Sequence, residues 1–487
     1  MSMPTPQWLT RPVPTWVMTL PWQPSWDLLA LCEAWPERYP CLFESVTPGK
    51  VQAGVGLDGQ PKKTTDAQPM GRYHLLMVRC EGADQTWTLH AGDDAERFFQ
   101  SLEAALSAHL GASPLASQPE DMDSSPLEVD LPFYGGWWGY WAYEAAQVFE
   151  PSLSLPESKQ PLAHWMRAPV AVVADLHQQS MHCVAEPGFE SQLTRVYQDW
   201  QQVAGASQPT STVAVQAPIE EPADRFLMGV ERIREYIYAG DVFQVNLSRL
   251  WQIPLKHTPP TQVYRCLRRA NPAPFAAYAD FGQWQIQSSS PERLVQVKDQ
   301  WVATRPIAGT RHRSRDWEKD MALLEELRAH PKEIAEHIML IDLERNDLGR
   351  LCLAGTVQVD ELMAIESYRY VHHLVSNIQG QLAGSVQPLA VFRATFPGGT
   401  ITGCPKVRCM QIIAELEQAA REAYTGSLGY ISRCGHLDSN ILIRSFIQQE
   451  DTLSFRAGAG IVADSEPQKE LEETRHKAKG LLKALTL

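Results

Sequence analysis

The sequence predicts an α+β fold with large sheets, and two observations carry this prediction. Strand-like and helix-like segments form groups along the chain and do not alternate regularly. The strand-like runs are apolar and rich in β-branched residues, as in Ala168–Leu176, Ser180–Glu186 and Val242–Ile253. The helix-like runs carry apolar residues at helical spacing, as in Arg225–Asp241, where Phe226, Val230, Ile233 and Ile237 share a face.

The remaining elements follow in order through the second half of the chain. Residues Phe275–Ser290 predict a hairpin that turns near Gly282. Lys332–Arg350 predicts a helix that breaks at its NDLG string. Ser454–Ser465 predicts a glycine-containing strand, and Glu466–Leu485 predicts a final amphipathic helix. In the first half, paired glycines among aromatic residues in Leu131–Ala146 predict close backbone packing before a helix.

Two segments rich in Ser, Pro and acidic residues predict linkers. They cover residues 111–130 and 203–224. We therefore expect an N-terminal region over 1–202, interrupted by the first linker, and a C-terminal region over 225–487.

Composition excludes several classes of protein. The chain has 487 residues and a formal net charge of −14, and no Lys/Arg-rich block stands out, so nucleic acid is not expected as a partner. No apolar run is long enough to span a membrane. The nine cysteines are scattered without a CxxC pair, which favours reduced thiols in the cytoplasm over disulfides or zinc.

Two helices each offer a pair of glutamates three residues apart. These are Glu333 with Glu336, and Glu470 with Glu473. Such pairs often form a solvated helix face, but two faces together could hold a hard cation such as Mg²⁺. Lys477 lies one turn beyond the second pair.

Other polar groups point to an anion site. The glycine-rich strings Phe396–Lys406 and Ala457–Gly460 could present backbone N–H groups, although tight turns also explain them. His372 and His373 are adjacent in a strand-like run, so they are expected on opposite faces. Arg444 falls in an apolar strand-like run, where a buried guanidinium needs a protein or ligand carboxylate.

The ordered strings resemble the chorismate-utilising enzyme family, densely over Arg225–Leu487 and more weakly before it. They are SPER, PIAGT, KEIAEH, DLERNDLGR, VHHLVSN, FPGGTITGCPK, GSLGY, IRS, AGAGIVADS and ETRHKA. The resemblance implies an α/β/β/α architecture with two large packed antiparallel sheets that span both halves of the chain.

Within that family, the strings resemble the aminodeoxychorismate synthase component I type, which makes 4-amino-4-deoxychorismate for 4-aminobenzoate and folate. Gln244 stands where isochorismate-forming members carry a lysine base, so ammonia is the expected nucleophile. Asn246 in QVNL and the string GGTITGCPK also resemble this type, so Gln244 and Asn246 are expected on the ammonia side. Ala308 in PIAGT departs from the PIKGT string, whose lysine is proposed to attack the ring, and matches anthranilate synthase instead.

The resemblance also assigns roles to individual residues. Glu292 is the expected general acid for the departing C4 hydroxyl, with His373 and Thr400 as further catalytic residues. Glu333, Glu336, Glu470 and Glu473 are the expected Mg²⁺ ligands. The expected chorismate-binding residues are Gly309, Thr310, Tyr424, Arg444, Gly458, Ala459, Gly460 and Lys477.

Two further expectations come from the same resemblance. A tryptophan pocket is expected where CLFES, which contains Ser45, meets Pro274, Phe275 and Ala276, although Leu42 and Phe43 could simply be core residues. A glutamine amidotransferase subunit is expected as partner, because no G-x-C-x-G nucleophile turn occurs in this chain. The alternatives are anthranilate synthase component I and a non-catalytic regulator that binds chorismate or tryptophan.

Overall fold

The computed structural model describes residues 7–9, 13–23, 25–46, 50–52, 71–83, 85–110, 130–205, 213–384 and 386–486. Most of the first predicted linker, residues 111–129, lies outside the described residues, and so do residues 206–212 of the second. Within the described part, no helix combines the length and the apolar character that crossing a membrane would need.

The first of two antiparallel sheets contains 13 strands among the described residues. In spatial order they are β1 (Gln7–Leu9), β2 (Thr15–Pro21), β10 (Ser180–Ala185), β9 (Val170–Asp175), β5 (Tyr73–Val78), β3 (Cys41–Glu44), β13 (Phe275–Asp280), β14 (Trp284–Ser290), β23 (Ser445–Gln449), β24 (Thr452–Ile461), β12 (Gln244–Pro254) and β11 (Ile219–Glu220), with β20 (Gly403–Cys404) also beside β12. The predicted hairpin over 275–290 is thus β13 and β14.

The second sheet contains 11 strands within the same described ranges. In spatial order they are β4 (Lys50–Gln52), β18 (Gln358–Ser367), β19 (Val371–Gln381), β16 (Trp301–Thr304), β15 (Arg293–Lys298), β22 (Leu437–Asn440), β21 (Ser427–Ser432), β7 (Gly136–Trp141), β8 (Ala163–Ala168) and β6 (Thr86–Leu89), with β17 (Ile307–His312) also beside β19. This architecture confirms the predicted α+β fold with two large antiparallel sheets.

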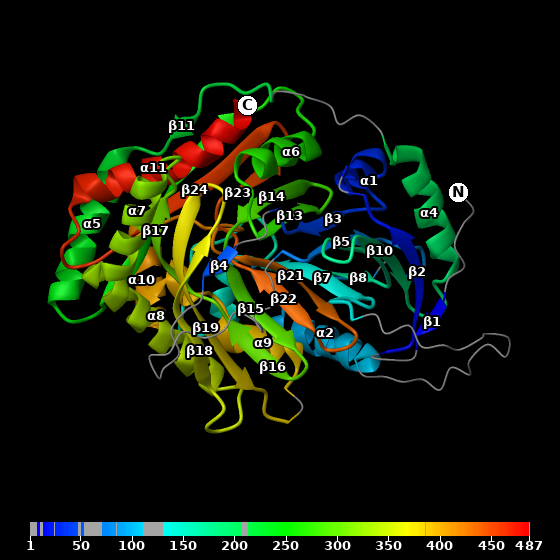
Figure 1. Ribbon diagram of the computed structural model, residues 1–487. Helices are drawn as coiled ribbons and strands as arrows, with labels where there is room; N and C mark the ends of the chain where they lie inside the picture. The colour runs from blue at the N-terminus through cyan, green and yellow to red at the C-terminus, as the bar shows by residue number, and fades with distance from the viewer. Residues whose placement is uncertain are drawn as a thin grey trace.

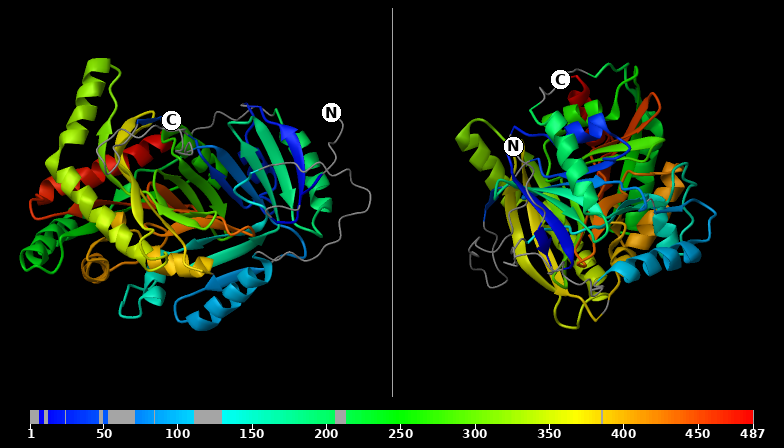
Figure 2. Two further views of the ribbon diagram at one scale, coloured as in Figure 1. Left: turned by 60° about the horizontal axis from the view of Figure 1, so that its bottom comes forward. Right: turned by 90° about the vertical axis from the view of Figure 1, so that its right-hand side faces the viewer.

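The helices surround the two sheets (Figures 1 and 2). They are α1 (Leu29–Ala34), α2 (Ala95–His109), α3 (Ala146–Phe149), α4 (Ser191–Val203), α5 (Ala223–Tyr238), α6 (Pro260–Ala270), α7 (Trp317–Ala329), α8 (Pro331–Gly349), α9 (Pro388–Thr395), α10 (Lys406–Glu417) and α11 (Pro467–Leu485), with 3-10 turns at Tyr143–Ala145 and Gly399–Ile401.

The alternation of strand side chains builds the layers. Ala277 and Ile286 of the first sheet share one buried cluster with Trp138 and Tyr140 of the second, which forms the core between the sheets. The opposite face of the first sheet packs on helices: α1 and α4 cover its N-terminal strands, and α6 and α11 cover β23, β24 and β12. On the second sheet, α2 and α9 pack against β7 and β15.

Strands from both halves of the chain interleave in both sheets. β3 lies between β5 and β13, and β7 pairs with β21. The glycines of the aromatic segment allow this packing, because a Cβ on Gly139 would lie 2.4 Å from a ring carbon of Trp165. The aromatic segment forms the strand β7 and precedes a helix as expected, because the 3-10 turn Tyr143–Ala145 and α3 follow it directly.

The α8 helix differs from its prediction. It does not break at the NDLG string but continues to Gly349. Asp347 accepts a hydrogen bond from Lys406 Nζ at 2.6 Å, and Leu348 is fully buried. These tertiary contacts stabilise the last helical turn and outweigh the weak helix propensity of Asn and Asp.

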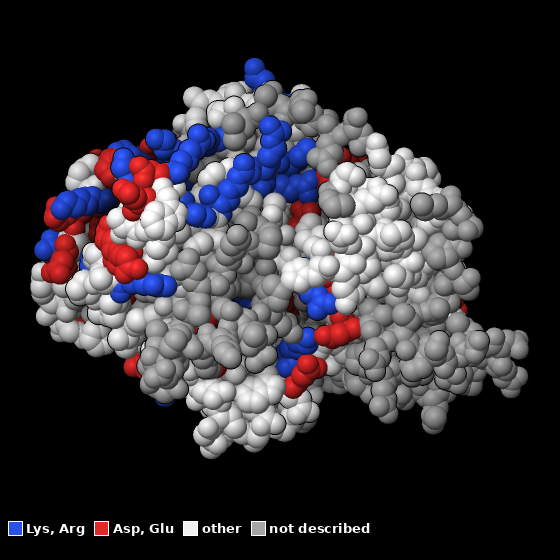
Figure 3. Space-filling view, in the orientation of Figure 1, with Lys and Arg blue, Asp and Glu red and all other residues white. Residues whose placement is uncertain are grey.

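Charged side chains are distributed unevenly on the surface. On the face in Figure 3, acidic side chains gather, with basic ones interspersed, where Figure 1 labels α7, and basic side chains predominate toward α6. Although the chain carries a net negative charge, this face therefore has a locally basic region.

Candidate active site

Glu292 is a buried carboxylic acid between β14 and β15. Only 4% of the residue is exposed, its backbone N–H donates to Ser290 Oγ at 3.2 Å, and its Oε1 atom has no hydrogen-bond partner among the described residues. Burial raises the pKa of Glu292 to about 7, although the Thr400 hydroxyl, the Ile307 backbone and Arg444 oppose this rise. Glu292 can therefore carry a proton near neutral pH, as a general acid must.

Arg444 supplies an unpaired cation next to this acid. It precedes β23 with a φ of 51°, instead of lying inside a strand as its sequence pattern indicated. Within the described residues, its guanidinium forms no ion pair, and the negative charge that acts on it is the carboxyl of Glu292. Burial lowers the pKa of Arg444, and the Glu292 charge partly restores it. A partly buried guanidinium without a protein partner is well suited to bind a ligand carboxylate.

His373 faces the same region from β19. Its Nδ1 atom lies 2.8 Å from Thr310 Oγ1, and burial lowers the pKa of His373 to about 3, so the ring is neutral. His372 points the other way, to Ser367 and Asp320. The two adjacent histidines therefore lie on opposite faces of the strand, as predicted.

The inner face of β12 and β24 forms one wall. Gly458 and Gly460 leave room there: a Cβ on Gly458 would lie 2.8 Å from Tyr424 Oη, and one on Gly460 would lie 2.5 Å from Gln244 Nε2. Asn246 Nδ2 donates to the Thr400 carbonyl at 3.3 Å. The side chain of Ala459 points to the apolar cluster beneath the helices, so Ala459 can offer only backbone atoms.

Tyr424 also borders a cavity of about 630 Å³ on the same inner face. The cavity is lined by strands β12, β23 and β24 and by the segment around Arg421, and it includes Arg456 and Glu422. Tyr424 therefore lies between this cavity and the Gly458 backbone.

Ala308 lies in β17 beside Glu292. The backbone of Ile307 hydrogen-bonds Glu292, so the next residue along the strand is close to it. Gly309 follows, and a Cβ there would lie 2.3 Å from Glu333 Oε2. A side chain at position 309 would displace the Glu333 carboxylate and press on Leu327 of α7, whose Cδ1 atom would lie 2.5 Å from that Cβ.

Three of the four glutamates come together between α8 and α11. Burial raises the pKa of both Glu336 and Glu470, and in each case the Glu473 charge adds to the rise. Glu336 Oε1 accepts from Gln244 Nε2 at 2.8 Å, and Glu473 pairs with Lys477 Nζ at 2.8 Å. Lys477 Nζ also donates to the Gly458 carbonyl at 2.8 Å, which connects α11 to β24.

Glu333 stands apart in an ion pair with Arg311 at 2.6 Å. Across the described ranges, no set of three or more His, Cys, Asp or Glu side chains is preformed for a metal ion. The donor chemistry nevertheless fits a hard cation, because the carboxylates of Glu336, Glu470 and Glu473 repel one another and Lys477, which pairs with Glu473, offsets only part of their charge.

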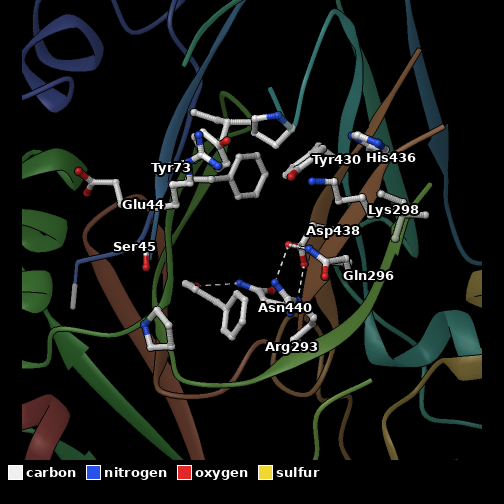
Figure 4. A pocket seen from close by; sticks show the side chains of 18 of the residues that line it. Glu44, Ser45, Tyr73, Arg293, Gln296, Lys298, Tyr430, His436, Asp438 and Asn440 are labelled. Atoms are coloured by element: carbon white, nitrogen blue, oxygen red, sulfur yellow. Dashed lines mark hydrogen bonds and ion pairs between the residues drawn. The ribbon is translucent and has the colours of Figure 1, made fainter. Parts of the chain in front are cut away.

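A partly open cavity lies between the sheets where the tryptophan pocket was expected. It has a volume of about 190 Å³, and its lining includes Ser45, Pro274, Phe275 and Ala276. Figure 4 shows Tyr430, Lys298 and Asp438 across the cavity from Ser45. We refer to it as the inter-sheet cavity.

The walls of the inter-sheet cavity are fixed by ion pairs. Arg293 binds Asp438 through two hydrogen bonds of 2.9 Å. The Glu44 carboxylate points away from the cavity, to Arg268 and Tyr264 at 2.8 Å (Figure 4). Ser45 Oγ is buried without a partner among the described groups, so it is free to bind a ligand.

Sequence reasoning missed a buried network that supports Tyr424. The Glu144 carboxylate accepts the backbone N–H groups of Arg421 at 2.7 Å and Glu422 at 3.0 Å. Arg421 also pairs with buried Glu417 at 2.6 Å. The partners are up to 278 residues apart in sequence, so no local pattern could have indicated them.

Comparison with known proteins places the chain among chorismate enzymes. A family model described as chorismate binding enzyme matches residues 62–483. Among curated relatives, anthranilate synthase component 1 of Synechocystis is 37% identical over 457 residues, which is 86% of this chain and 88% of the relative. Aminodeoxychorismate synthase component 1 of Bacillus subtilis is 41% identical over 435 residues, which is 86% of this chain and 90% of the relative.

A solved structure agrees with these sequence relatives. The crystal structure of anthranilate synthase component I from Streptococcus pneumoniae TIGR4 matches with a TM-score of 0.73 and 31% identity, over 87% of this chain and 95% of that one.

Proposed function

Because the chain belongs to the chorismate binding enzymes, we propose that it is an aminodeoxychorismate synthase component I. In this proposal it converts chorismate and ammonia to 4-amino-4-deoxychorismate, a precursor of 4-aminobenzoate and folate. The nine free cysteines fit a reducing compartment, so the cytoplasm is the proposed location.

The observation that carries the proposal is the buried acid Glu292 beside the unpaired Arg444. Chorismate has two carboxylates and a poor leaving group, the C4 hydroxyl. Arg444 and the Gly458–Gly460 backbone bind a carboxylate, and Glu292 protonates the departing hydroxyl. Neutral His373, positioned by Thr310, lines the same pocket without adding charge.

The four glutamates are proposed to hold Mg²⁺, with Glu336, Glu470 and Glu473 closest to one another. When bound, the ion would neutralise the ring carboxylate and withdraw charge from the diene. Gln244 then holds one of these carboxylates through its amide, where a lysine base would have activated water.

Ammonia is proposed to come from a separate glutamine amidotransferase subunit. The relatives that match over most of their length are themselves named as component 1, which supports a second component. We expect ammonium salts to support the reaction of this chain alone, and glutamine to support it only after the partner is added. Glutamine-dependent turnover by the pure chain would contradict this assignment.

Anthranilate synthase component I is the second candidate. It is favoured by Ala308, which offers no nucleophilic side chain beside Glu292, and by the relatives of that name. Ala308 requires that C4 amination proceeds without a lysine adduct at this position.

Product analysis separates the two candidates. The chain is incubated with chorismate, Mg²⁺ and ammonium, then with aminodeoxychorismate lyase, and the aminobenzoates are separated by chromatography. 4-Aminobenzoate that depends on the lyase supports the proposal. 2-Aminobenzoate formed without the lyase overturns it and establishes the second candidate, and an Ala308→Lys variant tests whether an amine here diverts the product.

We also propose that the inter-sheet cavity binds L-tryptophan. Phe43, Tyr73, Phe275 and Tyr430 offer aromatic contact, and Ser45 offers a free hydroxyl. Titration calorimetry should detect binding, and Ser45→Ala should weaken it about fivefold through the lost hydrogen bond. Ser191→Ala, at the exposed start of α4, is the control and should leave affinity unchanged. Equal binding by both variants would contradict the role of Ser45.

A further inference from the structure

Glu144 is a buried carboxylate whose side chain binds backbone N–H groups. It lies in the 3-10 turn Tyr143–Ala145 that follows β7, and only 1% of the residue is exposed. One of its oxygen atoms accepts the Arg421 N–H at 2.7 Å, and the other accepts the Glu422 N–H at 3.0 Å. A buried carboxylate is costly unless its oxygens are hydrogen-bonded, so these two bonds favour one position of the backbone at residues 421 and 422.

The backbone that this carboxylate binds has an unusual conformation. We call residues 418–425 the Tyr424 segment. Three of its residues have positive φ angles although they are not glycines: Gln418 at 51°, Glu422 at 54° and Thr425 at 63°. Such residues rarely adopt this left-handed conformation, so contacts with the surrounding structure must stabilise it. The 3-10 turn holds Glu422 from both sides, because the Tyr143 N–H also donates to the Glu422 carbonyl at 2.9 Å.

The Tyr424 segment carries one side chain to the proposed chorismate pocket. A Cβ on Gly458 would lie 2.8 Å from Tyr424 Oη, so this hydroxyl lies directly against the backbone that is proposed to bind a carboxylate. A second anchor of the segment is Arg421, whose guanidinium donates to the carbonyls of Asn246 at 2.7 Å and Ile401 at 3.2 Å. A rotation of the backbone two residues before Tyr424 would therefore move its hydroxyl relative to a fixed wall of the pocket.

We propose that Glu144 is a positioning residue of the active site, which holds Tyr424 against the chorismate pocket through the backbone of the Tyr424 segment. The inference rests on the proposed function, because it assigns a role within that reaction. The hydrogen bonds of the Glu144 side chain go to backbone groups, so it acts on the pocket through the chain and not by contact with substrate. Since Glu144 belongs to the first half of the chain, that half takes part in substrate binding.

Glu144→Gln isolates the contribution of the carboxylate. The amide has nearly the same volume but one acceptor oxygen, and its NH₂ group would face a backbone N–H, so at least one of the two hydrogen bonds is lost. KM for chorismate should rise about tenfold with little change in kcat, because Tyr424 is displaced. A purely structural role would instead lower the folded fraction, and so the rate at saturation, without changing KM. An unchanged KM would overturn the proposal.

A double-mutant cycle tests whether Glu144 acts through Tyr424. Tyr424→Phe removes the hydroxyl and should also raise KM for chorismate about tenfold. If one residue acts through the other, the variant that combines Glu144→Gln with Tyr424→Phe should have about the same KM as either single variant. Independent effects would multiply to about 100-fold, and that result would contradict the positioning role.

Asp199→Asn is the matched control for the loss of a buried carboxylate. Asp199 lies on α4 in the first half of the chain and is 6% exposed. It accepts from Tyr39 Oη at 2.7 Å and pairs with Arg38. The variant should lower the urea concentration at which the protein unfolds and leave KM for chorismate unchanged. An equal rise in KM in Asp199→Asn and Glu144→Gln would reduce the effect to a general loss of stability and overturn the proposal.

Hydrogen exchange followed by mass spectrometry tests the positioning without relying on activity. In Glu144→Gln, the amides of the Tyr424 segment should exchange faster than in the wild type, whereas those of β9 and β10 should not. Glu144→Asp keeps both oxygens on a side chain one methylene shorter, so it allows the same measurement where Glu144→Gln does not fold. Unchanged exchange of the Tyr424 segment in a folded variant would exclude the role of Glu144.

The same assays distinguish a failure of this inference from a failure of the proposed function. A wild-type chain that consumes no chorismate in the presence of Mg²⁺ and ammonium overturns both. An active wild type whose Glu144→Gln variant keeps its KM for chorismate overturns this inference alone.

Discussion

The burial of Glu292 leads to a quantitative prediction about how the reaction rate depends on pH. Burial raises its pKa to about 7 in the ligand-free protein, and the general acid must be protonated, so kcat/KM for chorismate should be constant at low pH and fall above neutrality. About 10% of Glu292 is protonated at pH 8 and about 1% at pH 9, so kcat/KM should fall about tenfold for each pH unit.

The assay must distinguish the titration of the enzyme from that of its co-substrate, because ammonium itself deprotonates as pH rises. Initial rates are therefore measured at saturating Mg²⁺ over a range of chorismate concentrations that gives kcat and KM, with total ammonium adjusted so that free ammonia stays constant from pH 6 to 9. Glu292→Gln, which cannot donate the proton, should lower kcat by about 100- to 10,000-fold with little change in KM.

A second variant moves the pH profile in a known direction. The Thr400 hydroxyl lowers the pKa of Glu292, so Thr400→Val should raise that pKa and shift the falling limb to higher pH. A kcat/KM that stays constant to pH 9 at fixed ammonia, or a falling limb that moves to lower pH in Thr400→Val, would refute the reasoning.

The remaining predictions concern binding, metal and packing. Arg444→Gln should raise KM for chorismate about 100-fold through the loss of a charged hydrogen bond, and an unchanged KM would exclude carboxylate binding there. Glu336→Gln and Glu473→Gln should raise the Mg²⁺ concentration needed for half-maximal activity, and full activity in EDTA would remove the metal from the proposal. Gly139→Ala should destabilise the fold by about 1–3 kcal/mol in urea unfolding, because the new Cβ meets Trp165 at 2.4 Å, whereas Gly349→Ala, with open space around it, should not.

Local sequence patterns predicted the elements that form without contacts to distant parts of the chain. The spacing of Phe226, Val230 and Ile233 predicted α5, and all three are buried. The end of α8 was mispredicted because the contact between Asp347 and Lys406 spans 59 residues. Sequence reasoning can weigh the propensity of NDLG but not such a distant partner.

In the candidate site too, local patterns predicted some features and missed those that depend on distant parts of the chain. Strand alternation predicted that His372 and His373 face opposite sides, and the structure confirms it. Arg444 was expected inside a strand, but its positive φ is set by the surrounding fold.

The interleaving of the two halves has consequences for truncation of the chain and for its folding during synthesis. Because β3 and β7 lie beside β13 and β21, a fragment over 225–487 would expose unpaired strand edges in both sheets. Such edges pair with other chains, so the fragment should aggregate even though it contains nearly every residue of the proposed chemistry. During synthesis, the early strands must also wait for partners more than 200 residues downstream, and such long-range pairing makes folding slow. The first half of this protein therefore supplies the strand partners that the second half needs in order to fold and to form the proposed active site.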